Sequence, residues 1–175
     1  MKNIIAFVFL LNSTTTFGQK IFTDSKDPFT NARTISTTLE PLYRVGFTNI
    51  LQVQTSVTIQ NDSITSYNFT FIVPATSYQI EKIDSSLKDL CLIKDQSGNI
   101  YTGKVTSSVS AAVLGSMYNS FACIITKEDF LKLRDVKLTD IKITTTGGNG
   151  GLFPIDKKRQ DNIANQIKVL LKRLN

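Results

Sequence analysis

The longest regular pattern in the chain is an alternation of apolar and polar side chains between Leu51 and Ile59. Mostly apolar residues occupy every second position, and glutamine, serine and threonine occupy the positions between them. A second alternation covers residues 66–73, after the turn-forming pair Asn61-Asp62. Because side chains of a strand point alternately to its two faces, each run predicts a strand with one buried face. The short polar connection predicts that the two strands form an antiparallel hairpin.

Several shorter segments also have the character of strands, being apolar or β-branched and bounded by turn residues. They are residues 87–94, 99–105, 121–125, 138–145 and 152–155. The threonine-rich stretch 20–40 fits either an extended arm or one edge strand over residues 32–39. Residues 111–117 fit a helix or a strand equally well, since their pattern follows neither period.

Two segments carry helix signals. Thr126 and Asp129 have the spacing of a capping box, which predicts a short helix near 127–134. Asp156 is expected to cap a C-terminal amphipathic helix, and its apolar stripe consists of Ile163, Ile167, Leu170, Leu171 and Leu174. We therefore predict an α+β fold, with a mostly antiparallel sheet of about six to eight strands. The C-terminal helix is expected to pack on that sheet.

The N-terminus has the three parts of a secretory signal peptide. Lys2 supplies a positive start, residues 4–11 are an unbroken apolar run, and small and polar residues follow up to Gly18. The apolar run is too short to span a bilayer as a helix. We predict a signal peptide at residues 1–18 and a single α+β domain at residues 19–175, exported to the periplasm, the outer surface or the extracellular space.

The absence of histidine from the sequence limits the chemistry that the chain can perform. It excludes Ser-His-Asp and Cys-His catalysis, and it excludes zinc sites that use histidine ligands. Neither a metal site nor a cofactor site is indicated by the remaining residues. A hydrolase that uses a carboxylate pair stays an alternative, but most aspartates occupy turn and cap positions. We expect a non-catalytic protein.

The formal charge of +6 is unevenly distributed along the chain. Residues 1–18 carry +1, residues 19–156 are balanced, and residues 157–175 carry +5. This charge predicts a basic surface, which is either the solvent side of a packing helix or a site of peripheral membrane contact. No aromatic residue interleaves the basic ones, which argues against nucleic-acid binding. The lysines of this basic surface are Lys157, Lys158, Lys168 and Lys172.

The two cysteines, Cys91 and Cys123, lie in apolar segments predicted to be strands. In an exported protein such an isolated pair is compatible with a disulfide. Two free thiols that pack as small apolar groups are equally compatible with the sequence. Both alternatives remain open.

A few large apolar residues could line a ligand pocket between the sheet and the C-terminal helix, or belong to an ordinary core. These residues are Tyr67, Phe69, Phe71 and Ile163.

The layout of signal peptide, strand pairs, Thr-x-x-Asp helix, final strand and basic helix resembles that of uncharacterised secreted β-rich proteins of Bacteroidota-type bacteria. The resemblance implies export, but it assigns neither an activity nor functional residues. We expect an exported non-catalytic domain with a binding or structural role in the cell envelope or outside the cell, and its partner is an unknown protein or small molecule. The alternatives are binding of a small apolar ligand and hydrolysis by a carboxylate pair.

Overall fold

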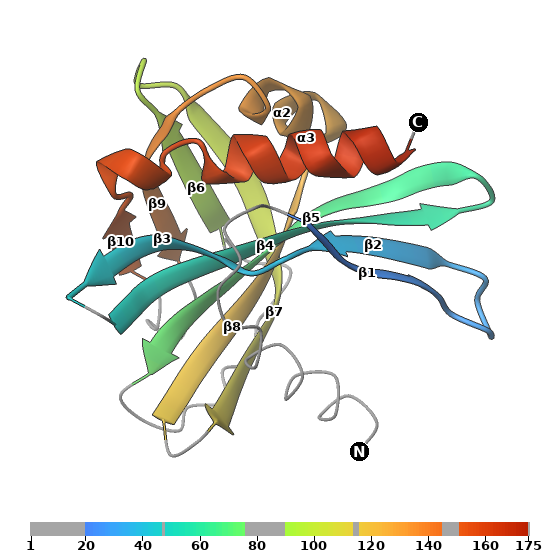
Figure 1. The fold of residues 1–175 in the computed structure, drawn as a ribbon, viewed down its shortest axis with the longest axis horizontal. Helices are drawn as coiled ribbons and strands as arrows, with labels where there is room; N and C mark the ends of the chain where they lie inside the picture. Colours follow the sequence, from blue (N-terminus) through green and yellow to red (C-terminus); the bar gives the residue numbers. More distant parts are fainter. Residues whose placement is uncertain (1–19, 47, 76–89, 114–115, 145–150, 175) are drawn as a thin grey trace.

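The structure is a computed structural model that describes residues 20–46, 48–75, 90–113, 116–144 and 151–174. Within these residues, ten strands form one sheet, in the order β1-β2-β4-β5-β8-β7-β6-β9-β10, and β3 also pairs with β4 (Figure 1). The paired strands are antiparallel, as predicted. The strands are β1 (Ile21–Lys26), β2 (Arg33–Thr37), β3 (Glu40–Val45), β4 (Thr48–Gln60), β5 (Ser63–Ala75), β6 (Leu90–Asp95), β7 (Ile100–Val113), β8 (Ser116–Ile125), β9 (Leu138–Thr144) and β10 (Gly151–Pro154).

The predicted central hairpin is confirmed as β4 and β5. Val53 lies opposite Phe71, and Val57 lies opposite Tyr67, so the apolar positions of both strands share one face. Asn61 and Asp62 connect the strands with positive φ angles of 51° and 59°. Asparagine and aspartate tolerate this left-handed backbone better than most residues, which explains why this pair forms the turn.

The sheet has about ten strands, so the prediction of six to eight is wrong. The N-terminal region forms a hairpin of β1 and β2, where the sequence indicated an arm or one edge strand. It then adds β3, which includes Pro41. Of residues 111–117, residues 111–113 end β7 and residues 116–117 begin β8, and the other two lie outside the described residues. The strands β1, β2 and β3 have five or six residues each, and whether such short segments form strands depends on the strands beside them.

Helix α2 (Lys127–Leu133) begins as the capping box predicts, and Thr126 Oγ1 accepts a hydrogen bond of 3.1 Å from the Asp129 amide. Helix α3 (Asn162–Leu174) buries Ile163, Ile167 and Leu170 of the predicted stripe, and Leu171 and Leu174 are partly buried. A 3-10 turn, η1 (Lys157–Arg159), precedes it, so the single helix expected from Asp156 is divided. The Asp156 carboxylate accepts a hydrogen bond of 3.0 Å from Arg159 Nε and does not cap a helix.

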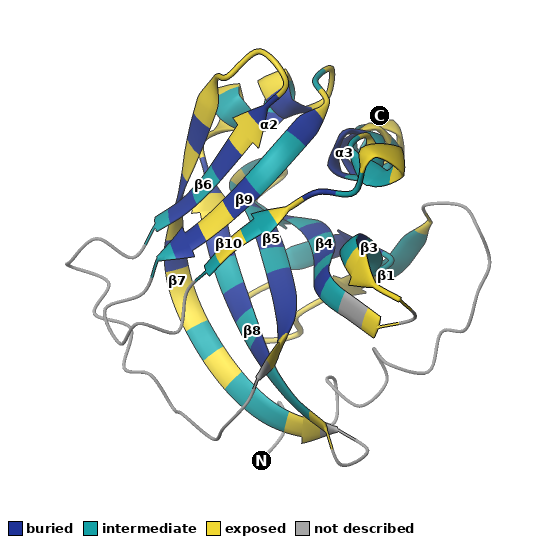
Figure 2. Cartoon of the chain, turned by 90° about the vertical axis from the view of Figure 1, so that its left-hand side faces the viewer, coloured by how far each residue is buried: buried dark blue, intermediate teal, exposed yellow. Residues whose placement is uncertain are grey.

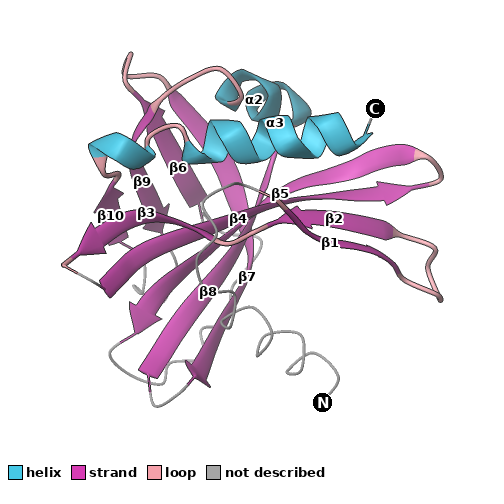
Figure 3. Ribbon diagram, viewed as in Figure 1, coloured by secondary structure: helices cyan, strands magenta, loops and turns pink. Residues whose placement is uncertain are grey.

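Both helices lie on the same face of the sheet, which is its inner face (Figure 3). The strands alternate between buried residues on this face and more exposed residues on the other, outer face (Figure 2). The sheet bends around the helices, so the Asp156 amide after β10 donates a hydrogen bond of 3.0 Å to the Leu42 carbonyl on β3. One hydrophobic cluster, which includes residues from Ile35 to Leu170, fills the inner side.

The predicted signal peptide, residues 1–18, lies outside the described residues, and its prediction is therefore unchanged. Export and the localisation that follows from it also stay predictions. None of the helices within the described ranges has the length and hydropathy needed to cross a membrane.

Candidate interaction surface

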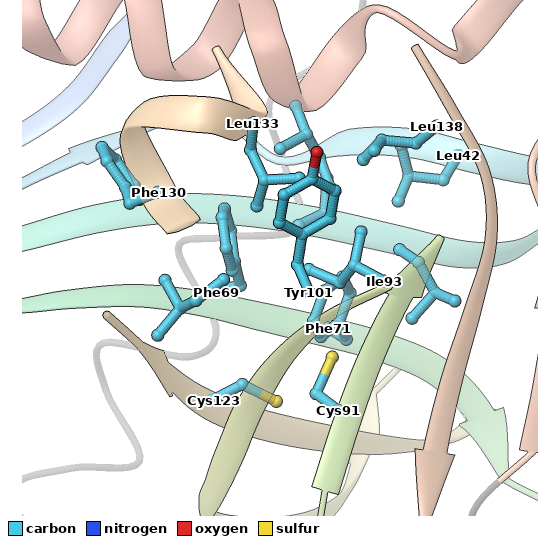
Figure 4. Packing of buried hydrophobic residues seen from close by; sticks show 14 of the residues in the cluster. Leu42, Phe69, Phe71, Cys91, Ile93, Tyr101, Cys123, Phe130, Leu133 and Leu138 are labelled. Atoms are coloured by element: carbon cyan, nitrogen blue, oxygen red, sulfur yellow. The ribbon is translucent and has the colours of Figure 1, made fainter. Parts of the chain in front are cut away.

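The four side chains predicted to line an apolar pocket are buried, but they come from two elements. Tyr67, Phe69 and Phe71 follow one another on the inner face of β5, whereas Ile163 lies in the first turn of α3. The ring centroid of Phe130, on α2, is 4.8 Å from that of Tyr67 and 5.9 Å from that of Phe69. Figure 4 shows Phe130 beside Phe69. The helix that covers these two rings is therefore α2, and the four residues join the common hydrophobic cluster.

Cys91 and Cys123 are free, buried thiols, and the disulfide alternative is wrong. The two side chains approach to 3.9 Å (Figure 4). Hydrogen bonding between the thiols and burial both raise the pKa of Cys91 well above its usual range. Cys91 therefore keeps its proton at neutral pH, and the two thiols pack as small apolar groups.

The sheet order explains why the thiols are close without forming a bond. Cys91 is on β6 and Cys123 is on β8, with β7 between them. Strands two positions apart are separated by about 9.6 Å, whereas the Cα atoms of a disulfide lie within about 7 Å. Gly103 of β7 lies opposite Cys91. A Cβ atom at Gly103 would lie 3.7 Å from Cys91 Cβ and 3.2 Å from the Ile124 carbonyl oxygen.

The basic surface predicted near the C-terminus is divided between two elements. Lys157 and Lys158 are exposed on η1, and Lys168 and Lys172 are exposed on α3. The nearby Arg173 is also exposed, but its guanidinium is paired with an aspartate of β1, as described next. The four lysines are therefore accessible, but they lie on two elements rather than along one helix.

Asp24 links the two ends of the described chain through arginine. Its carboxylate accepts two hydrogen bonds of 2.7 Å from Arg33, and Arg173 Nη2 donates a further one of 2.7 Å. The two guanidinium groups hold the pKa of Asp24 far below its usual range. This cluster is exposed, so its role is to dock β1 on α3 rather than to stabilise the fold strongly.

A buried amide, Gln166 of α3, fills a break in the sheet between β2 and β3. Its Nε2 donates to the carbonyl oxygens of Thr38 and Val53, at 2.9 Å and 3.2 Å. Its Oε1 accepts a hydrogen bond of 2.6 Å from the Thr55 hydroxyl. Backbone groups that have no partner strand at this break are thus satisfied from the helix, as buried polar groups require.

A buried carboxylate, Asp95, organises the turn between β6 and β7. It accepts hydrogen bonds from the amides of Ser97 and Asn99, from Asn99 Nδ2 and from the Tyr101 hydroxyl, at 2.8 Å to 3.0 Å. Burial alone would raise the pKa of Asp95, but the hydrogen bonds outweigh burial and lower it. The sequence indicated only a turn residue here, since its contact with Tyr101 depends on the pairing of the two strands.

The outer face of β6 to β10 carries three lysines, each directly opposite an aliphatic side chain. Lys142 lies opposite Leu152, Lys104 opposite Ile124, and Lys94 opposite Ile100. All six side chains are exposed. No ion pair among the described residues involves these lysines. We call this set the outer lysine–aliphatic surface: Lys94, Lys104, Lys142, Ile100, Ile124 and Leu152.

The outer face of β4 and β5 has a different composition. Its cross-strand pairs are uncharged and polar, and we call this set the neutral outer patch: Gln54 with Thr70, Ser56 with Asn68, and Thr58 with Ser66. The alternation of the strands could have indicated both surfaces. It could not indicate which face of β6 and β9 the helices cover, so the outer lysines were not identified from the sequence.

Among the carboxylates of the described residues, Glu40 has a raised pKa. Burial is the cause, and it outweighs a hydrogen bond from Thr38 and the charge of Arg159, which both lower the pKa. The Thr38 hydroxyl donates to Glu40 Oε1 at 3.3 Å. The carboxylate of Asp156 forms an ion pair with the same Arg159.

Comparisons with known protein families, with curated proteins and with solved structures find no match to the chain.

Proposed function

We propose that the protein is an exported, non-catalytic domain that acts by binding another molecule in the cell envelope or outside the cell. The observation that carries this proposal is the outer lysine–aliphatic surface. Leu152 is 66% exposed and Ile100 is 62% exposed, beside lysines that have no ion pair within the described residues. These aliphatic side chains are spread over β7, β8 and β10 of one face, and exposed apolar residues beside such lysines support an interaction site.

The polar groups of the interior support a binding role over a catalytic one. Asp95 and Gln166 are nearly or fully buried, and each uses its polar atoms in hydrogen bonds that hold the fold together. A general acid needs a pKa that its surroundings raise. Hydrogen bonds lower the pKa of Asp95, and Glu40, whose pKa burial raises, already accepts a hydrogen bond from Thr38. The groups left over for another molecule are therefore those of the surface.

The N-terminal pattern supports export, because a positive start, an apolar run and a small residue at position 18 are the parts of a secretory signal. Fractionation of cells that produce the full chain tests this half of the proposal. We expect the protein outside the cytoplasm and shortened by about the length of residues 1–18. Recovery of the uncut chain from the cytoplasm would contradict export.

Site-specific photo-crosslinking in the native cells tests the binding half. A photoreactive amino acid replaces Leu152 of the outer lysine–aliphatic surface, or Ser56, a less exposed position of the neutral outer patch, as a control on the same face of the sheet. We expect a crosslinked product, protein or lipid, from position 152 and none from position 56. Equal labelling at the two positions, or none at position 152, would count against a binding role for this surface.

A further inference from the structure

We propose that the outer lysine–aliphatic surface docks on an anionic phospholipid bilayer. This inference rests on the proposed function, because it names the partner of the same surface. It uses four observations: the charge of the surface, its cross-strand pairs, the side chains that it lacks, and the contrast with the neutral outer patch.

The charge of this surface is positive although the body of the protein is balanced. Residues 19–156 carry equal numbers of basic and acidic side chains. On the outer face of β6, β7, β9 and β10, however, three lysines stand with one carboxylate, Asp140, which lies opposite Lys94. Lysine ammonium groups near a membrane surface are attracted to anionic headgroups. The local excess of positive charge therefore complements a surface of lipid phosphates.

The pairing of lysine with leucine or isoleucine fits the depth profile of a bilayer surface. Leu152 and Ile124 are 66% and 40% exposed, and each lies beside the aliphatic stem of a cross-strand lysine. A lysine stem can lie along apolar surface while its ammonium group stays in the polar layer. Aliphatic tips that reach the acyl boundary, with lysines at the headgroups, are the arrangement found in interfacial membrane binding.

The composition of the surface favours lipid over protein or nucleic acid. Neither arginine nor an aromatic residue occurs at the outward positions of β6, β9, β10 and residues 100–106 of β7, and the outward Tyr118 of β8 lies six residues from Ile124. Protein interfaces are enriched in aromatic residues and arginine and depleted in lysine. Single-stranded nucleic acids are bound by stacking on aromatic rings. Lysine with leucine and isoleucine matches neither of these partners.

The chain has no tryptophan, so one introduced tryptophan reports on the surface that carries it. We compare Leu152→Trp with the control Ser56→Trp, using protein in the form that its native cells accumulate. With vesicles of phosphatidylglycerol and phosphatidylcholine, we expect the emission of the first variant to shift to shorter wavelength and that of the control to stay unchanged. Vesicles of phosphatidylcholine alone should shift neither. Equal shifts with both lipids, or none, would overturn the proposal.

Charge variants locate the binding surface. The triple variant Lys94→Gln, Lys104→Gln and Lys142→Gln should bind anionic vesicles about a hundredfold more weakly, since each lysine near the surface contributes about a fivefold factor. The matched control Lys157→Gln, Lys158→Gln and Lys172→Gln removes the same charge near the C-terminus. It should weaken binding about threefold at most. A larger loss in the control than in the outer triple variant would place membrane contact at the C-terminal lysines and overturn the inference.

Failure of this inference can be told apart from failure of the proposed function. Crosslinking of a protein through position 152, without vesicle binding, would refute the membrane partner and keep the binding role. Neither crosslinking nor vesicle binding would refute both. Crosslinking to lipid through position 152, together with the emission shift of Leu152→Trp, would support both.

Discussion

The polar groups on the two faces of the sheet have opposite surroundings. On the inner face, Gln166 and Asp95 are buried, and each makes several hydrogen bonds to other parts of the chain. On the outer face of β6 to β10, Lys104 and Lys142 are exposed and make no ion pair within the described residues. A buried polar group without a partner costs free energy, whereas an exposed lysine remains solvated. The polar groups of the inner face are thus needed for stability, whereas the lysines of the outer face remain available for binding.

The difference predicts that substitutions on the two faces separate stability from binding. Changes to inner residues should lower the free energy of unfolding, by amounts that depend on the packing or hydrogen bonds lost. Changes to the outer lysine–aliphatic surface should leave that free energy nearly unchanged. An outer variant that loses as much free energy of unfolding as an inner one would contradict this difference between the two faces.

The largest effect is expected from Phe130→Ala. Phe130 is fully buried on α2, and its ring packs on the rings of Tyr67 and Phe69. Its removal leaves a cavity between helix and sheet, so the free energy of unfolding should fall by about 4 kcal/mol. Urea unfolding measures this change. Phe130→Leu, which keeps most of the apolar volume, should lose clearly less. A loss below about 1 kcal/mol in Phe130→Ala would show that α2 does not hold this part of the core.

The next effect is expected at Gln166, where α3 closes the break between β2 and β3. Gln166→Leu leaves the carbonyl groups of Thr38 and Val53 and the hydroxyl of Thr55 without this partner, and should cost about 3 kcal/mol. Gln166→Glu is a sharper test of the hydrogen bonds. Its buried carboxylate would face two carbonyl oxygens, so the variant should be less stable at pH 7 than at pH 5, relative to the wild type. No pH dependence of that difference would contradict the hydrogen-bond arrangement.

The sequence allowed the prediction of those elements whose signals are local. The alternation over residues 51–59 and 66–73 predicted β4 and β5, because the pattern of apolar and polar side chains is complete within each strand. Thr126 and Asp129 predicted the start of α2, because a capping box closes within one turn. Three apolar residues of the C-terminal stripe, Ile163, Ile167 and Leu170, are fully buried as predicted.

The remaining features depend on contacts between distant segments. Gln166 has the polar character of a surface position, and it is buried because a break between two strands more than one hundred residues earlier lies beneath it. The separation of Cys91 and Cys123 by β7 depends on strand order, which a hairpin pattern does not determine. The outer lysine–aliphatic surface depends on which face α2 and α3 cover. Sequence periodicity carries none of these relations.

A smaller effect is expected from Asp95→Asn. The asparagine Nδ2 would meet the donors Asn99 Nδ2 and Tyr101 Oη, so the variant should lose about 2 kcal/mol at pH 7. The pKa of Asp95 is lower in the folded protein than its usual value. Its carboxylate therefore contributes stability above the unfolded pKa of about 4, and that stability is lost as pH falls through the folded pKa. The difference in free energy of unfolding between wild type and Asp95→Asn, measured by urea unfolding, should become smaller below about pH 4.

Tyr101→Phe is the control for Asp95→Asn, because it removes one hydrogen bond and keeps the carboxylate and its three other donors. It should cost less than Asp95→Asn. An increase in the stability difference between wild type and Asp95→Asn as the pH falls would contradict the lowered pKa of Asp95.

The smallest effect on stability is expected from the outer variant Ile100→Thr, Ile124→Thr and Leu152→Thr. Threonine keeps the strand propensity of these positions, and the replaced side chains are 40% to 66% exposed, so the free energy of unfolding should change by about 0.5 kcal/mol or less. Binding to anionic vesicles should fall about tenfold, because the apolar contacts are lost while the lysines remain. Loss of stability without loss of binding would reverse the roles of the two faces. Loss of binding at unchanged stability would show that these aliphatic residues are exposed for a partner, since folding does not need them.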